Sequence, residues 1–229
     1  MNSIDVIGAA ILAEIKTIRT SLKYALELIL DPWELIHSEV TEQIELESQL
    51  HLDDVSAFYG TPTQHYCMVL GNATHCHIIC AHIWPRHTLG KGLEALELLR
   101  ADINNPRNYL RLHKSIEKAF DKKRLYFSYV MEGDNIRFTL NILDPNLLNE
   151  TLSVNGNVMT FSMLEGRRFH YAFAPTARPF LRIVAVHATK AVEKAHVFGW
   201  IEDKDDVVAK RERALDLARL SLDPNKLNI

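Results

Sequence analysis

Three short stretches decide the fold of this chain: CAHIWP at residues 80–85, NYLRL at residues 108–112 and IEKAFD at residues 116–121. The first stretch is an apolar, strand-like run that ends at Pro85 and carries a single histidine. The third stretch belongs to a predicted helix over His113–Asp121, because its apolar residues can face inward while its lysines stay in water. The sequence therefore predicts a strand, a variable loop and then a helix.

Regular apolar spacing predicts helices in the N-terminal region. Apolar residues from Ile4 to Ile29 recur in steps of three and four, which predicts a first helix. A second predicted helix begins at Asp31-Pro32 and ends near residues 50–54. The apolar residues of the first helix keep a near-heptad spacing, which leaves two interpretations open. The helix either packs on its own domain or pairs with a second copy in a homodimer.

Turn signals between β-rich runs predict an α+β fold in the rest of the chain. We expect hairpins that join 65–70 to 75–84, 124–131 to 135–143, and 158–164 to 169–173. We expect further helices at Leu93–Leu99, Phe180–Phe198 and Lys204–Ser221.

Composition narrows the functional classes. The 229 residues are 47% apolar and 24% charged, which argues against a disordered or fibrous chain. With 26 Lys+Arg against 29 Asp+Glu, the net charge of −3 excludes a broad basic coat, so nucleic-acid binding would be local or metal-assisted. The longest apolar stretch near the start is too short to span a bilayer. We expect an intracellular protein, cytoplasmic or nuclear, or a secreted effector if a leader has been removed.

In this order the three stretches resemble HNH endonucleases, in particular a subfamily with the pattern A-H-I-x-P, N-x-L-x-L and a helix ending in x-x-F-D. The segment Cys67-Met68-Val69-Leu70-Gly71 is similar to the start of that subfamily, C-x-[VL]-[TL]-G. The resemblance covers residues 66–127. It implies a ββα-metal core, a β-hairpin packed on one helix around a divalent cation. The predicted regions are a helical part at 1–58, this core at 59–130, and hairpins and C-terminal helices packed on it at 131–229.

The resemblance also implies site residues for a metal-dependent hydrolysis of phosphodiester bonds in DNA, with RNA left open. His82 is the general base, because an imidazole titrates near neutral pH. Asn108 holds the loop to the hairpin and orients the imidazole. Glu117 stands nine residues later, where the family usually has histidine, and a carboxylate is a good ligand for Mg²⁺ or Mn²⁺. His113, one helical turn earlier, is a candidate second ligand.

Cations near these residues predict contacts to nucleic-acid phosphates with low sequence specificity. They are Arg86, His87, Arg107, Arg111 and Lys114. The competing interpretation is a catalytically inactive HNH-like module that binds DNA or a protein partner and in which Glu117 holds no metal.

The cysteines allow a third interpretation. Three cysteines lie close together, at Cys67, Cys76 and Cys80, among several histidines. An odd, clustered set indicates a reducing compartment or a metal site rather than a disulfide scaffold, so a structural Zn²⁺ is an alternative.

Overall fold

The computed structural model describes residues 53–73 and 77–201. The chain divides into two compact units, Met1–Glu39 and Val40–Ile229, and every described residue belongs to the second. The predicted N-terminal helices with their dimer interface, the helix at 204–221, and His75 and Cys76 lie outside the described residues. In the described part, no helix is long and apolar enough to cross a membrane.

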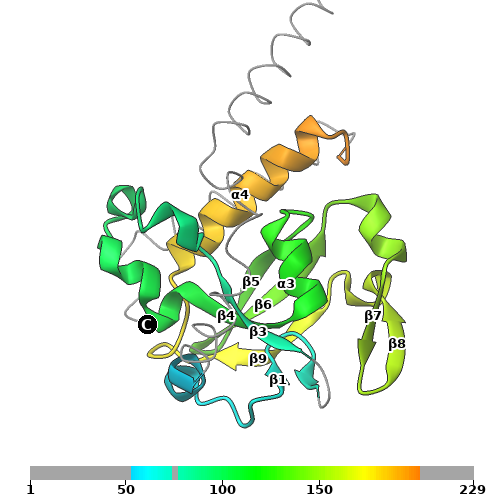
Figure 1. Ribbon diagram of the computed structural model, residues 1–229, viewed down its shortest axis with the longest axis horizontal. Helices are drawn as coiled ribbons and strands as arrows, with labels where there is room; N and C mark the ends of the chain where they lie inside the picture. The colour runs from blue at the N-terminus through cyan, green and yellow to red at the C-terminus, as the bar shows by residue number, and fades with distance from the viewer. Residues whose placement is uncertain (1–52, 74–76, 202–229) are drawn as a thin grey trace, which may run out of the picture. The chain divides into compact units, whose positions relative to one another are not determined.

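A β-hairpin followed directly by a helix occupies the middle of the chain (Figure 1). Strand β3 (Ile78–His82) pairs antiparallel with β4 (Tyr109–His113), and α3 (Lys114–Asp121) begins at the next residue. The register places His82 opposite Tyr109. This β3–β4–α3 order confirms the predicted α+β class and fits a ββα-type core.

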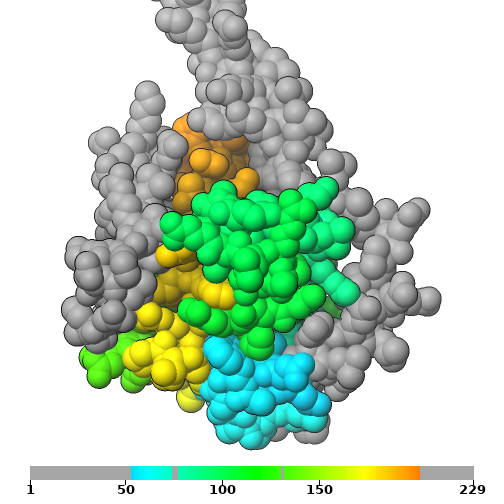
Figure 2. All heavy atoms as spheres, turned by 90° about the vertical axis from the view of Figure 1, so that its left-hand side faces the viewer, coloured from blue at the N-terminus to red at the C-terminus, as the bar shows by residue number. Residues whose placement is uncertain are grey.

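A long connection joins the two strands of this hairpin. It contains four short 3-10 helices, η1 (Arg86–Thr88), η2 (Leu93–Leu96), η3 (Arg100–Asn104) and η4 (Pro106–Asn108). The predicted helix at 93–99 is thus only the single 3-10 turn η2. In Figure 2 the atoms of residues 53–73 (cyan) lie against green atoms of this connection, with yellow atoms of residues after 160 beside them. Hydrogen bonds tie residues 53–73 to their neighbours, from the Tyr59 hydroxyl to the Tyr109 carbonyl at the start of β4 and from the Tyr171 hydroxyl to the Tyr59 carbonyl.

The apolar face of α3 explains why the helix forms at this point. Ile116, Ala119 and Phe120 are buried, while Lys114 and Lys118 are exposed, as the spacing predicts. His113 caps the N-terminus, because its Nδ1 accepts the Ser115 N–H at 3.2 Å. The helix begins one residue later than predicted, since His113 has extended backbone angles.

A three-stranded antiparallel sheet and one long helix complete the core. Strands β5 (Leu125–Glu132), β6 (Asn135–Ile142) and β9 (Arg168–Phe173) lie in that order. Helix α4 (Leu181–Val197) confirms the predicted helix at 180–198. Its buried alanines, Ala188, Ala191 and Ala195, form a core cluster with Tyr126 and Leu143. Small side chains on this face let α4 approach the sheet closely.

Two predicted hairpins are wrong. Among the described residues, the run at 65–70 does not pair with residues 77–84; instead β1 (Tyr66–Cys67) pairs with β2 (Gly71–Asn72) around residues 68–70. Strand β3 takes β4 as its partner instead. The run at 158–164 does not pair with β9, because β8 (Asn157–Thr160) pairs with β7 (Thr151–Val154) and residues 161–164 form the 3-10 helix η6 (Phe161–Leu164). The Asn155-Gly156 turn, with both residues at positive φ, closes the β7–β8 hairpin.

Candidate active site

His82 is the last residue of β3 and is half-buried. Its ring lies against the ring of its strand partner Tyr109, with a centroid distance of 4.2 Å and an interplanar angle of 51°. Burial raises the pKa of the Tyr109 hydroxyl to about 12, so this neighbour stays neutral at physiological pH. The hairpin therefore holds the imidazole against an uncharged aromatic surface at the end of a strand.

Asn108 is fully buried at the base of the long connection. Its Oδ1 accepts the Trp84 N–H at 2.8 Å, and its Nδ2 donates to the carbonyls of Trp84 at 3.2 Å and Ile103 at 2.9 Å. The Asn108 carbonyl accepts the Ile83 N–H at 2.8 Å. The amide thus ties both ends of the connection together directly after His82. The predicted role of Asn108, to hold the loop to the hairpin, needs contacts of this kind. They bind the Trp84 main chain, two residues after His82.

Glu117 and Asp121 are four residues apart on α3 and share a side-chain hydrogen bond. Desolvation and then the Glu117 carboxylate raise the pKa of Asp121 well above its usual range, while the Lys123 charge opposes the shift. Asp121 keeps solvent-exposed surface, and the Glu117 carboxylate lies within hydrogen-bond reach of it. Asp121 was not among the residues predicted from the sequence. Its only signal was its i+4 spacing from Glu117 at the end of the x-x-F-D pattern.

His113 does not fit the predicted role of a second metal ligand. It is buried, its Nδ1 accepts the Ser115 N–H, and its Nε2 lies 3.2 Å from the Ser153 carbonyl of β7. An imidazole that accepts at Nδ1 and donates at Nε2 has no lone pair left for a metal. His113 is therefore a helix cap that also joins α3 to the β7–β8 hairpin.

Arg111 does not fit the predicted role of a phosphate contact, because its side chain is completely buried. Its guanidinium donates to the Thr61 hydroxyl, to the Thr63 carbonyl at 2.9 Å and to the Gln64 carbonyl at 2.5 Å. The residue holds the 61–64 loop against β4. An arginine in a strand looks like a surface residue in the sequence, and nothing there shows that three loop groups enclose it.

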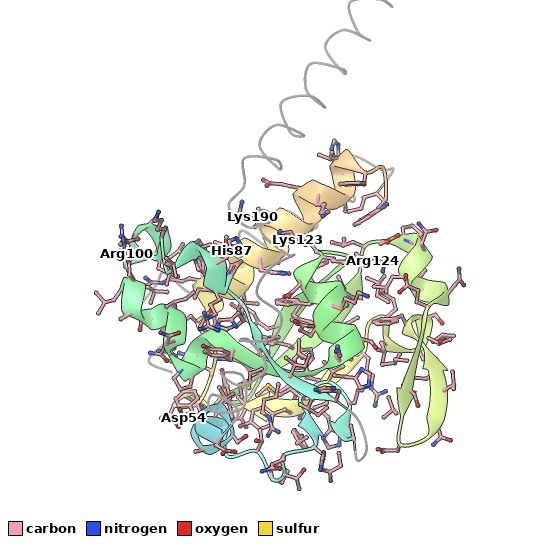
Figure 3. All side chains as sticks on the ribbon, viewed as in Figure 1. Asp54, His87, Arg100, Lys123, Arg124 and Lys190 are labelled. Carbon is pink, nitrogen blue, oxygen red and sulfur yellow. The ribbon has the colours of Figure 1, made fainter. Side chains whose placement is uncertain are left out.

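The other predicted phosphate contacts keep accessible surface. Lys114 is exposed, and so is His87 on η1, which Figure 3 labels. Arg86 and Arg107 are half-buried. The Arg107 Nε donates to the Arg178 carbonyl at 3.0 Å, and its guanidinium lies 4.3 Å from the centre of the Phe180 ring.

Helix α4 anchors the end of α3 that carries Asp121. The His187 ring stacks on Phe120 at a centroid distance of 3.7 Å, and its Nε2 donates to the Phe120 carbonyl at 3.0 Å. Burial and then the Lys123 charge lower the pKa of His187 to about 3, so the ring is neutral. Lys123 is buried and has a φ of 55°, and Figure 3 shows it close to α4.

The cysteines of the described part are buried and protonated. Burial raises the pKa of the Cys67 thiol, and it raises that of Cys80 to about 12. The Cys67 Sγ accepts the His113 N–H at 3.3 Å. Over residues 53–73 and 77–201, no group of three or more His, Cys, Asp or Glu side chains is arranged to hold a metal ion.

Comparison with known proteins supports the resemblance over one segment. Residues 67–128, about a quarter of the chain, match a family model described as HNH endonuclease. Searches of curated proteins and of solved structures found no match. The matched segment begins at β1 and ends within β5, so it contains β3, the long connection, β4 and α3. The segment that folds as the β3–β4–α3 unit is thus the part by which this chain is similar to the HNH endonuclease family.

Proposed function

We propose that this protein is a metal-dependent endonuclease that hydrolyses phosphodiester bonds in DNA, with His82 as the general base. One observation carries the proposal. The segment that matches HNH endonucleases folds as a hairpin followed by a helix, and in it Asn108 fixes the main chain directly after His82. The same chemistry would act on RNA, and substrate competition separates the two.

The role of His82 follows from its chemistry and position. Hydrolysis of a phosphodiester needs a water that loses a proton as it attacks phosphorus, and a neutral imidazole near pH 7 is suited to accept that proton. Asn108 has a positioning role, because its amide bonds hold the strand end on which the imidazole stands.

The carboxyl groups of Glu117 and Asp121 fit a divalent cation. Mg²⁺ is commonly bound by one or two carboxylates together with waters and substrate oxygens, so two adjacent carboxyls on one helix suffice. Desolvation and then the Glu117 carboxylate raise the pKa of Asp121, so the two carboxyl groups share a proton, and a divalent cation that displaced this proton would neutralise both carboxylates. When bound, the cation supplies positive charge where the phosphate becomes more negative. In this proposal Asp121, and not His113, is the second metal ligand beside Glu117.

The proposal is tested by cleavage of supercoiled plasmid with Mg²⁺, Mn²⁺ or EDTA. We compare wild type with His82→Ala, Glu117→Gln and Asp121→Asn, and use Asp134→Asn, in the exposed turn between β5 and β6, as a matched control. We expect nicking that EDTA abolishes, a loss of about 10²–10⁴-fold in His82→Ala, and full activity in Asp134→Asn.

Two results would overturn the nuclease assignment. One is wild-type protein that shifts DNA in a gel but cuts it with neither metal, which would identify the inactive binding module. The other is a His82→Ala variant that cleaves at the wild-type rate. Circular dichroism and thermal unfolding of each variant show that a lost activity is not a lost fold.

A further inference from the structure

Two arginines from distant parts of the chain lie on segments that are hydrogen-bonded to each other, and one of them, Arg107, immediately precedes Asn108. Arg107 belongs to η4, and Arg178 belongs to the segment between β9 and α4. The two segments are joined by the bond from Arg107 Nε to the Arg178 carbonyl at 3.0 Å and by the bond from the Phe180 N–H to the Arg107 carbonyl at 3.0 Å. The Phe180 ring supports the Arg107 guanidinium from one side at 4.3 Å. These contacts fix the position of Arg107.

Neither guanidinium is neutralised within the part of the chain that the structure describes. Over these residues, the recorded ion pairs include neither Arg107 nor Arg178, and the Arg178 side chain donates no recorded hydrogen bond. Among the described residues, Asp102 is the one carboxylate whose charge reaches Arg107, but its oxygens accept the Leu99 N–H and the Asn105 side-chain amide instead.

The electrostatics of this pair are unfavourable without a counter-charge. Burial and then the charge of Arg178 lower the pKa of Arg107, and the same Arg178 charge also reaches the half-buried Tyr129 hydroxyl. Two half-buried cations that repel each other cost free energy, and an anion between them removes that cost. Arginine donates two parallel N–H groups, the geometry that phosphate oxygens match.

We propose that Arg107 and Arg178 form a phosphate subsite that binds the backbone of the nucleic-acid substrate beside His82. This inference rests on the proposed nuclease function. Arg107 immediately precedes Asn108, and the following residue, Tyr109, is the strand partner of His82. A phosphate held by this pair therefore lies close to the base, and it positions the substrate without reading its sequence.

Salt dependence of DNA binding tests the subsite directly. We measure the anisotropy of a labelled DNA duplex in EDTA, so that no cleavage occurs, for wild type, Arg178→Gln and Arg178→Lys. Each phosphate contact contributes about −0.9 to the slope of log K against log salt concentration. Loss of one contact in Arg178→Gln therefore shrinks the ratio of Kd values between 200 and 50 mM salt about 3.5-fold. Arg178→Lys keeps the charge and should largely keep the slope.

Arg167→Gln is the matched control, because it removes the same charge from an exposed residue just before the start of β9, whereas Arg178 follows the end of that strand. We expect it to bind with the wild-type slope. Arg178→Gln binding with the same slope as Arg167→Gln would overturn the subsite, and if wild type still cleaves plasmid, the nuclease assignment survives. Wild type that neither binds nor cleaves DNA would overturn both. Arg107→Gln is a less direct variant, because it also breaks the bond to the Arg178 carbonyl.

Discussion

Neutral His187 makes the stability of this fold depend on pH in a way that can be calculated. The ring is 3% exposed, stacks on Phe120, and donates to the Phe120 carbonyl at the end of α3. A protonated imidazole would place a positive charge in this apolar site, beside the buried Lys123. Protonation therefore opposes the packing of α4 against α3.

The size of the effect follows from the two pKa values. Burial lowers the pKa of His187 from 6.5 to about 3 in the folded protein. Because the unfolded chain takes up a proton that the folded protein excludes, this stabilisation is complete above pH 6.5 and is lost as the pH falls from 6.5 towards 3. At about 1.4 kcal/mol per pH unit, the free energy of unfolding decreases by about 2 kcal/mol between pH 7.5 and pH 5.

The assay is urea unfolding of wild type and His187→Gln at several pH values from 7.5 to 5. The glutamine has no titrating ring, and contributions from other groups cancel in the difference between the two proteins. We expect the stability advantage of wild type to shrink by about 2 kcal/mol across this range. A difference that stays constant with pH, or grows as the pH falls, would refute a buried neutral His187.

Three further substitutions test contacts that the fold depends on. Asn108→Asp puts an oxygen where Nδ2 now donates to two carbonyls, so urea unfolding should show a loss of about 3–5 kcal/mol and plasmid nicking should disappear. Arg111→Met removes three bonds to the 61–64 loop, and we expect about 2–4 kcal/mol lower stability and faster proteolysis in that loop. Gly90→Ala places a Cβ 2.3 Å from the Arg100 carbonyl at a φ of +76°, so its thermal unfolding midpoint should fall well below that of Gly166→Ala, where the φ is +69° and the space is open.

The sequence predicted those features that depend on residues close together in the chain. The apolar faces of α3 and α4 and the turn at Gly133 were predicted, because periodicity and turn residues act over a few positions. The partner of β3 was predicted wrongly from its own neighbourhood. Its true partner lies beyond the four 3-10 turns, and pairing at that separation depends on tertiary packing.

The candidate site came from the resemblance rather than from local pattern. The resemblance implied His82, Asn108 and Glu117 as site residues, and their roles stay predictions. The burial of Arg111 and His113 was not visible, because the carbonyls of Thr63 and Ser153 that accept from these side chains come from segments far away in sequence. The proximity of Arg178 to Arg107 likewise depends on how the segment after β9 returns to η4.

The clasp that Asn108 forms at the base of the 83–108 connection has a consequence for how such a protein can diversify. The bonds between Asn108 and the Trp84 main chain hold the two ends of this connection together. Doubling the length of a flexible loop costs only about 0.6 kcal/mol of closure entropy. Insertions at exposed positions of this stretch, such as Leu99, should therefore cost the hairpin little, so a longer connection can add new surface while the pairing of β3 with β4 stays unchanged.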